Sequence, residues 1–507
     1  MIKEVKLLTY IYGVRIYTAV VAILLIPLLI KRIGVEAYGL LGFFTVLQAC
    51  LSILDAGVGG VLTREAIISK QNIKRFKKFN VLYRKIIVIF VVMAISIVLL
   101  GGLFSIKFSA SWLNTNIGNS TIILCTTLMF CIFALRYLQG PFRSLLLSNE
   151  SQVTITTINL INTTLSQPIT LFLLYIFEGD VIFYFIMQLL SAALTCGLMI
   201  IFSERVRKNI LKNINEQNNL DDDVIDISVS KFFTFALQLS MLTILWVVVN
   251  QSDKLTLTRF LPLSEYAMYS VAISIMGILA IISDPLNQYL QPKLTKYFHE
   301  KNTQQYSRLY FNAFKFIITI TIPLSVFLFF FSEKILFVWS NNTHLALDVS
   351  KYLPWLFLGG VFSIYSNLIF LLLYSHGQLK KHTIVYVIFS AIIIPLNIYI
   401  AKNFHGDGTS IFYAANAILL FITWGGYNLV ERFRNGIGII VFYISPLVII
   451  EFVYYYYMSH LELFSESRLL SFVYLSFIGF GSMVIAMGYT FGMHKILPSF
   501  DFKMSKK

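Results

Sequence analysis

The stretch AYGLLGFFTVLQACLSILDAGVGGVL, residues 37–62, is apolar over more than the length of a membrane span and carries a single charge, at Asp55. About 20 predominantly apolar residues are enough for a helix to cross a bilayer. A carboxylate inside such a span costs several kcal/mol or more unless it is paired, hydrated or protonated, so it marks a candidate functional site. A second acid, Asp284, lies near the end of another apolar stretch, residues 264–287. The recurrence indicates a membrane transporter built from two related halves.

The composition agrees with a membrane protein and excludes an ordinary soluble domain. Hydrophobic residues make up 57% of the chain and charged residues only 13%, whereas soluble domains carry roughly a quarter charged residues. The net charge of +15 does not indicate a nucleic-acid partner, because the Lys and Arg residues fall in short loops instead of on a folded soluble face. The four cysteines lack metal-ligand spacing. His376, His382 and His405 fall near predicted helix ends, where solvation is favoured over ligation, so no cofactor is expected.

Apolar stretches of helix length recur along the whole chain and predict fourteen transmembrane spans. Six lie in the first half of the chain and eight in the second. An even number of spans places both termini on the same side of the membrane. The predicted spans are residues 11–30, 37–62, 86–106, 121–139, 154–177, 181–202, 232–251, 264–287, 312–332, 352–374, 384–401, 409–428, 438–458 and 469–492.

The distribution of Lys and Arg sets the orientation of these spans. Of the 40 Lys and Arg residues, 28 fall in segments that this arrangement places on one side, nine fall on the other side, and three lie inside spans. Cytoplasmic loops carry the excess of Lys and Arg in membrane proteins. Both termini are therefore predicted to be cytoplasmic. The long polar segment 203–231, which contains Asp221 to Asp223, is predicted to be a cytoplasmic linker between two domains.

The two halves of the chain repeat one order of features. In each half, an Arg and a Glu in an outer loop precede the span that ends near the aspartate, Asp55 or Asp284, and basic residues follow it. Two six-helix units of this kind have parallel topology and are related by a pseudo-two-fold axis along the membrane normal. We therefore expect an all-α integral membrane fold with two six-helix bundles, residues 1–202 and 232–430, around a central cavity. An extra helix pair and a cytoplasmic tail follow in residues 431–507.

Three motifs connect the chain to a known family. RIGVEAYG at residues 32–39 leads through Leu54-Asp55-Ala-Gly57 to Thr63-Arg64-Glu65, NQSDK at residues 250–254 is followed by Tyr266 and Tyr269, and ILFVW occupies residues 335–339. With these motifs the chain resembles, over nearly its whole length, the Wzx-type oligosaccharide-lipid flippases of the multidrug/oligosaccharidyl-lipid/polysaccharide exporter superfamily. It departs from many members in having fourteen predicted helices instead of twelve. It also has HGDG at residues 405–408, where a Gly-rich start of helix 12 is usual.

The resemblance implies a cargo, a location and partners. Members of the family carry an undecaprenyl-diphosphate-linked oligosaccharide from the cytoplasmic to the periplasmic leaflet of the bacterial inner membrane. The oligosaccharide then serves the synthesis of a surface polysaccharide such as O-antigen, capsule or exopolysaccharide. The resemblance therefore implies a transporter and not an enzyme, with the lipid-linked oligosaccharide and membrane lipids as partners. A polysaccharide polymerase is a candidate partner.

Three basic residues inside spans are candidates for binding the diphosphate of such a cargo. The planar guanidinium of Arg suits phosphate oxygens because it binds them with two parallel hydrogen bonds. Arg15 is the strongest candidate, since it lies inside helix 1 at the same depth as Asp55, and we expect the two to pair in the cavity. The alternative is a structural ion pair that only orients the two helices. Arg136 and Lys315 lie near the predicted inner ends of their spans, where their long side chains are expected to reach the membrane surface instead.

Four further charged residues complete the candidate site. Lys254 and Asp253 lie near the outer end of helix 7 within the family motif, as candidates for diphosphate binding and ion coupling. The alternative is an exposed pair at the membrane boundary. Asp284 is a second coupling candidate, with helix capping or solvation as the alternative. Glu451, in helix 13, has no cation nearby in the sequence and is expected to be a lumenal carboxylate, to be protonated, or to face a groove formed by the extra helix pair.

The membrane potential favours export of an anionic headgroup. Each elementary charge that crosses the membrane is worth roughly 2.3 kcal/mol per 100 mV, so outward movement of a dianionic headgroup runs downhill. Asp55 and Asp284 are expected to bind a returning proton or sodium ion. Two other functions stay open. A drug/cation antiporter of the same superfamily would favour an acidic cavity over one with Arg15, and a membrane enzyme of polysaccharide assembly would need a larger outer loop than any predicted for this chain.

Overall fold

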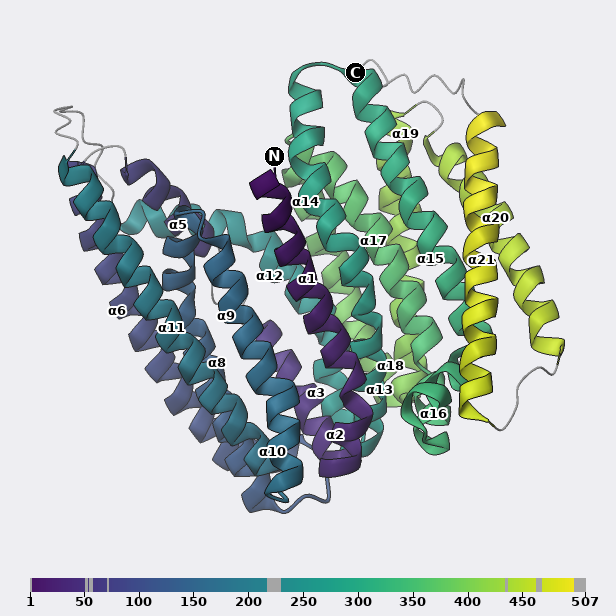
Figure 1. The fold of residues 1–507 in the computed structure, drawn as a ribbon, viewed down its shortest axis with the longest axis horizontal. Coiled ribbons are helices and arrows are strands. Elements are labelled where there is room, and N and C mark those ends of the chain that lie inside the picture. Colours follow the sequence, from purple (N-terminus) through teal and green to yellow (C-terminus); the bar gives the residue numbers. More distant parts are fainter. Residues whose placement is uncertain are drawn as a thin grey trace. The chain divides into compact units, whose positions relative to one another are not determined.

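The computed structural model describes residues 2–50, 53, 58–70, 73–216, 229–433, 436–461 and 467–496. Within these ranges the chain forms helices joined by short turns, as the hydropathy predicts for an all-α membrane fold. Ten of the described helical segments are long and apolar enough to span a membrane. The chain divides into two compact units, Met1–Ala267 and Met268–Lys507, and each is described by itself below (Figure 1).

The first unit contains the helices up to α12 and the beginning of α13. Two short π-helical turns interrupt its longer helices, η1 (Ser105–Ser109) and η2 (Leu165–Ile169). The α-helices of this unit are α1 (Ile2–Leu24), α2 (Ile26–Ile33), α3 (Val35–Ala49), α5 (Val58–Ser69), α6 (Ile73–Phe104), α7 (Ala110–Trp112), α8 (Asn119–Ser148), α9 (Gln152–Thr164), α10 (Thr170–Ile176), α11 (Val181–Glu216), α12 (Val229–Phe260) and α13 (Leu263–Met276).

The core of the first unit forms where α8 packs against both α6 and α11. One face of α6 carries large apolar side chains at helical spacing, including Phe76, Phe79, Tyr83 and Phe90, and all of these are buried. The Phe90 ring stacks on Tyr137 of α8, with 4.5 Å between the ring centroids. Offset stacking of this kind adds to the stabilisation from burial alone.

Polar side chains hold α9 to its neighbours in the same unit. The Tyr10 hydroxyl of α1 lies 2.9 Å from the Thr157 hydroxyl of α9. On another face of the α9 segment, Ser191 of α11 donates a hydrogen bond to the side chain of Asn162, at 3.0 Å. Lipid tails are as apolar as Leu, so helices inside a membrane gain little from apolar burial, and interhelical hydrogen bonds contribute to their association. This explains why a predicted span, residues 154–177, is rich in Thr and Asn.

The second unit contains the remaining helices. Its centre is α17, which packs against α14, α15 and α18. The C-terminal helices α20 and α21 pack on α15 and on each other (Figure 1). The elements of this unit are α14 (Ile278–His299), α15 (Thr303–Ser340), α16 (Thr343–Ser350), α17 (Leu353–Ser375), α18 (Leu379–Leu420), η3 (Phe421–Gly425), α19 (Gly426–Arg432), α20 (Gly436–His460) and α21 (Arg468–Ile496).

Ten spans are found where fourteen are predicted, and each difference has an identifiable cause. The predicted spans 384–401 and 409–428 fall in one continuous segment, because the helix assignment runs through α18 although His405 has non-helical backbone angles (φ 54°, ψ −148°). The stretch 154–177 is helical, but its polar side chains lower its hydropathy. The count covers described residues only, and this affects the stretches 37–62 and 232–251.

The boundary between the two units differs from the predicted one. The sequence places it in the linker 203–231, whereas the structure places it after Ala267. The reason is that α12 packs against α3 and α5, which groups the seventh predicted span with the first six. Residues 203–216 of the predicted linker continue helix α11, and Asp221 to Asp223 lie outside the described residues.

Gly39 of α3 permits a close helix contact inside the first unit. A Cβ atom at this position would lie 2.4 Å from the carbonyl oxygen of Leu263 and 2.7 Å from its Cγ. We therefore expect Gly39→Ala to lower the thermal unfolding midpoint of the purified protein, because overpacking typically costs about 1–3 kcal/mol. Gly13→Ala is the matched control, since no heavy atom lies within 4 Å of a Cβ there. Equal midpoints for the two variants would contradict this packing.

Candidate functional site

Arg136 lies inside the first unit and contacts one other helix, α3, through two residues. One terminal nitrogen of its guanidinium, Nη1, donates a hydrogen bond to the Gln48 side-chain oxygen of α3. The guanidinium carbon lies 5.7 Å from the centroid of the Phe44 ring, over its face, an arrangement that stabilises a cation. Phe44 in turn packs edge-on against Phe185 of α11, with 5.5 Å between ring centroids. The side chain of Arg136 is therefore positioned by α3 and, through Phe44, by α11.

The predicted reach of Arg136 to the membrane surface stays a prediction, but its side chain does not extend along α8 toward the helix end. The apolar window ends at residue 139, but α8 continues to Ser148, so Arg136 lies about three turns before the helix end. Its guanidinium also turns toward Gln48 instead of toward that end. A cation this far inside a membrane helix is costly and marks a functional site by default. Arg136 is the best-positioned cation among the candidate residues of the first unit.

Arg15 and Asp55 are not joined into a described pair. Arg15 is an exposed residue of α1, and among the described residues it has no hydrogen bond or ion pair. Val14 beside it is buried, and the hydroxyl of Tyr17 lies 3.2 Å from that of Thr164, so these neighbours hold α1 against α9. Asp55 lies outside the described residues. The predicted pair of Arg15 with Asp55 therefore stays a prediction.

Asp253 and Lys254 of α12 do not form the exposed boundary pair that was the alternative expectation. Asp253 is buried, with 3% of its surface exposed. The Nζ atom of Lys254 instead donates a hydrogen bond to the carbonyl oxygen of Asn250 in the same helix, at 2.8 Å. Neighbouring residues on a helix point to different faces, so the Asp253 carboxylate and the Lys254 amine lie in different environments. A buried acid in a membrane helix remains a candidate for ion binding.

Asp284 lies near the middle of the continuous helical segment Leu263–His299 and not at its C-terminal end. The apolar window ends at residue 287, but α14 continues to His299, so Asp284 lies about four turns before the helix end. The capping alternative is therefore wrong. Asp284 is exposed and begins a polar stripe on α14 that continues through Asn287, Gln288 and Gln291. The spacing of three and four residues places these side chains on one face.

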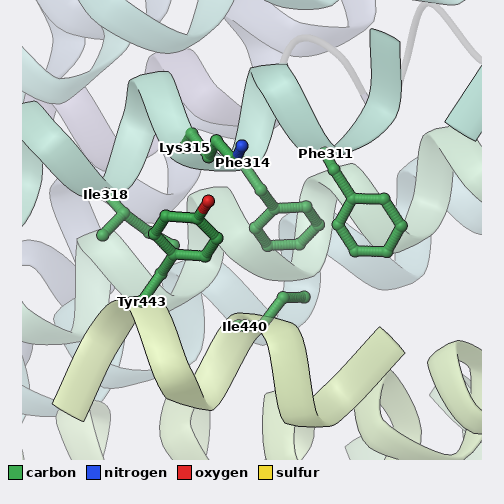
Figure 2. A pocket seen from close by; sticks show the side chains of 6 residues that line it. All are labelled: Phe311, Phe314, Lys315, Ile318, Ile440 and Tyr443. Carbon is green, nitrogen blue, oxygen red and sulfur yellow. The ribbon is translucent and has the colours of Figure 1, made fainter. Parts of the chain in front are cut away.

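Lys315 does not extend toward a helix end either. It lies about three turns after the start of α15 at Thr303, and its Nζ atom is 4.8 Å from the centroid of the Tyr443 ring of α20. The cation thus rests on an aromatic face inside the second unit. Around it is a narrow, mostly apolar crevice in which Phe311, Phe314, Lys315 and Ile318 of α15 face Ile440 and Tyr443 of α20 (Figure 2).

Glu451 is enclosed within the C-terminal helix pair and is not lumenal. Its surface is 0% exposed, and its Oε2 atom accepts a hydrogen bond from the Ser482 hydroxyl of α21, at 2.6 Å. Its Oε1 atom is buried and has no partner among the described residues. The expectation of a lumenal carboxylate is therefore wrong, because the side chain is fully buried and bonded to α21.

Sequence analysis missed a polar cluster near the start of α18. Arg432 is buried, with 7% exposed. Its Nη1 atom donates to the side-chain oxygen of Asn428 at 2.8 Å, and its Nη2 atom donates to the side chain of Gln378. The prediction that His382 is solvated is wrong, since it is buried and its Nδ1 accepts a hydrogen bond from the Trp424 indole at 2.9 Å. No local pattern reveals these contacts, because Gln378 and Arg432 are far apart in the sequence.

His376 follows the last residue of α17 and is expected to make stability pH-dependent. Burial lowers the pKa of His376 below its ordinary value, and this outweighs the backbone acceptor Leu372, which raises it. The folded protein therefore takes up a proton less readily than the unfolded chain. Its contribution to stability is present above about pH 6.5 and is lost as the pH falls.

We expect the wild-type thermal midpoint to drop more steeply between pH 7.5 and pH 5.5 than that of His376→Phe. The variant keeps an aromatic ring beside Phe298, whose centroid lies 4.2 Å from the His376 ring, but it cannot titrate. His344→Phe, at an exposed position of α16, is the control and should behave like the wild type. Identical pH profiles for all three proteins would contradict the proposed linkage.

Comparison with known proteins identifies the fold. The MatE family model matches residues 232–399, and no curated protein sequence matches the chain. A multidrug resistance MATE family transporter of the MOP superfamily, solved in an inward-facing conformation, superposes with a TM-score of 0.64 at 12% identity, covering 81% of this chain and 94% of that one. The lipid II flippase MurJ, in an inward closed conformation, superposes with a TM-score of 0.63 at 15% identity, covering 96% of this chain and 99% of that one. The chain has the MATE/MurJ fold.

A third structure, of a point mutant of the Vibrio cholerae MATE transporter VcmN, superposes with a TM-score of 0.52 at 12% identity. It covers 81% of this chain and 97% of that one. The MurJ match leaves only 4% of the chain uncovered, which is fewer residues than α20 and α21 contain together. The MATE/MurJ fold of this protein therefore extends, in its MurJ form, into the C-terminal helix pair. At these identities the likeness shows the fold alone.

Proposed function

We propose that the protein moves a polyprenyl-diphosphate-linked oligosaccharide from the cytoplasmic to the outer leaflet of the membrane. Arg136 carries this proposal. It is a guanidinium held inside a helical unit by Gln48 and Phe44, and the described residues offer it no carboxylate partner. A fixed cation of this kind suits an anionic cargo, and a guanidinium binds phosphate oxygens through two parallel hydrogen bonds.

The other candidate cations have supporting roles in this proposal. Arg15, exposed on α1, would contact the diphosphate as it enters or leaves, and it would pair with Asp55 between substrates. Lys254 is turned along α12 toward Asn250, and Lys315 lies against Tyr443. For these two lysines, a substrate contact requires the side chain to leave its present partner. We therefore rank them below Arg136 and Arg15.

The polar face of α14 supports a hydrated path for the headgroup. Asp284 is exposed near the middle of a membrane-spanning segment, and an ionised carboxylate facing lipid there would cost several kcal/mol. Asn287, Gln288 and Gln291 extend the same face. We infer that this stripe lines a water-filled cavity, where amide side chains would also hydrogen-bond to sugar hydroxyls.

Cysteine labelling tests whether this stripe is wet. In a variant without the native cysteines, we expect Gln288→Cys to react with a membrane-impermeant thiol reagent in at least one orientation of the vesicles, because the thiolate that reacts forms in water. Ile282→Cys, on another face of α14, is the matched control and should react much more slowly. Equal rates at the two positions would contradict a hydrated stripe.

The driving force in this proposal is the membrane potential, assisted by a counter-ion. Outward movement of a dianionic headgroup gains roughly 2.3 kcal/mol per charge per 100 mV. Asp284 and Asp55, and the buried Asp253, are the carboxylates that would bind a returning proton or sodium ion. We also propose the bacterial cytoplasmic membrane as the location, with both termini cytoplasmic, and a polysaccharide polymerase as the protein that receives the cargo.

A drug/cation antiporter is the second candidate, because the MatE model and two MATE structures match the chain. Such a protein would bind cationic amphiphiles and would need acids where Arg136 lies. The ligand that the purified protein binds distinguishes the flippase from the antiporter. We expect native mass spectrometry of the purified protein to detect a polyprenyl-diphosphate oligosaccharide, and to show weaker binding of the monophosphate. Binding of ethidium without binding of the lipid diphosphate would reverse the ranking.

A further inference from the structure

The N-terminal part of α6, which the Lys and Arg distribution predicts to be cytoplasmic, presents an outward face of basic residues. Lys77, Lys78, Arg84 and Lys85 are all exposed, and no hydrogen bond or ion pair engages any of them within the described chain. The opposite face, with Phe76, Phe79 and Tyr83, is buried in the core. Helix α6 contains no Asp or Glu anywhere in its length, so no acid on this helix offsets the charge.

Along α6 the exposed side chains change from basic to apolar while staying on the same side of the helix. Val81, between the basic residues, is 57% exposed, and the face continues through Val88 at 61% and Val92 at 57%. The spacing of seven, four and again seven residues keeps Val81, Val88, Val92 and Leu99 on one side of the helix. These apolar side chains are in position to contact acyl chains, and the cations lie directly beyond them.

Helix α11 shows the same change at its C-terminal end. Leu190, Leu194 and Ile201 are exposed at 57%, 49% and 48%, and the same stripe continues into exposed Arg205, Lys208 and Lys212.

The two basic stripes lie at the same level of the first unit. Helices α6 and α11 are neighbours (Figure 1), and Arg207 of α11 donates a hydrogen bond to Asn80 of α6 at 3.2 Å. Arg207 also binds Glu204, with 2.5 Å between Nη2 and Oε2. Glu204, the acid on this part of α11, is thus already paired with Arg207, which faces inward. The outward cations of α6 and α11 together form what we call the basic face.

We propose that the basic face binds the headgroups of anionic glycerophospholipids in the cytoplasmic leaflet. The continuity of each stripe argues for an amphiphile, because the same face offers apolar contacts for acyl chains and then cations for a phosphate immediately above them. Clusters of four to eight Lys and Arg next to a membrane span bind anionic lipid surfaces. A soluble acidic partner would use the cations but would have no use for the apolar part of the stripe.

The test compares lipid binding by two variants that lose the same charge. The first variant replaces Lys77, Lys78, Arg84 and Lys85 with Gln, a residue that helices tolerate well. The second replaces Arg308, Lys296, Lys351 and Lys402, four exposed cations of the second unit, in the same way. Phosphatidylglycerol and phosphatidylcholine are titrated separately into the detergent-purified full-length proteins, and bound lipids are counted by native mass spectrometry.

We expect the first variant to bind phosphatidylglycerol at least about tenfold more weakly than the wild type, since each cation near the surface contributes to the attraction. The second variant should lose less than about threefold, and phosphatidylcholine binding should not change in either. Equal losses in the two variants would show a general effect of net charge and would overturn the proposal. The proposal would also be overturned if the first variant still bound phosphatidylglycerol but no longer bound a polyprenyl diphosphate. The basic face would then belong to the cargo site. A thermal midpoint close to wild type in phosphatidylcholine confirms that the first variant is folded.

Discussion

Arg136→Gln is expected to reduce translocation of the lipid-linked oligosaccharide by about 100-fold or more. Under the proposed function, the substitution would remove a charge-assisted, bidentate contact to the diphosphate, and hydrogen bonds to charged groups contribute about 1.5–3 kcal/mol each. Every 1.4 kcal/mol or so corresponds to a tenfold change in rate. The measurement is the initial rate in proteoliposomes that contain equal amounts of folded protein.

Arg136→Lys separates charge from geometry. Lys keeps the positive charge but loses the planar fork that matches phosphate oxygens, so we expect a rate between those of Arg136→Gln and the wild type. Gln48→Leu removes the acceptor that positions the guanidinium and should reduce the rate less than Arg136→Gln does. Normal translocation by Arg136→Gln, with a normal thermal midpoint, would show that Arg136 is only structural.

Asp284→Asn is expected to abolish the dependence of translocation on an imposed proton or sodium gradient, with a large loss of rate when that gradient is the only driving force. The reason is that Asn keeps the size of the side chain but cannot bind a proton or provide a full negative charge to sodium. The measurement is the rate as a function of pH and sodium concentration, with and without a membrane potential.

Glu451→Gln is the matched control for this second experiment. Glu451 also carries a carboxyl group in a predicted span, but it is enclosed between α20 and α21 and bonded to Ser482. We expect this variant to keep the ion dependence of the wild type. If Asp284→Asn and Asp55→Asn both translocate the cargo normally across the whole range of pH and sodium, carboxylate coupling is wrong.

The fold class could be predicted because hydropathy alone reports it. Apolar windows located the membrane spans, but they stopped at the first polar residues, whereas helices continue beyond the hydrocarbon region. Helix α8 runs on to Ser148 and α14 to His299. This difference changed the position along the helix that was assigned to Arg136 and Asp284. Residues that looked like boundary residues are well inside their helices.

Side-chain partners could not be predicted, because they depend on how each helix is rotated about its axis and on which helices are neighbours. Arg136 and Gln48 are 88 residues apart in sequence, and Glu451 and Ser482 are 31 apart. A single sequence gives the charge of each residue but not the contact. The same limit explains why the buried cluster around Arg432 was missed.

Direct observation of translocation tests the central claim. The purified protein is reconstituted into liposomes that contain a fluorescent polyprenyl-diphosphate oligosaccharide, and the protection of the headgroup from a membrane-impermeant quencher is followed over time. We predict movement between leaflets that requires the protein, accelerates when the potential favours movement of the anion, and is nearly absent with Arg136→Gln. Proteoliposomes that transport ethidium but leave the lipid in its original leaflet would contradict the account.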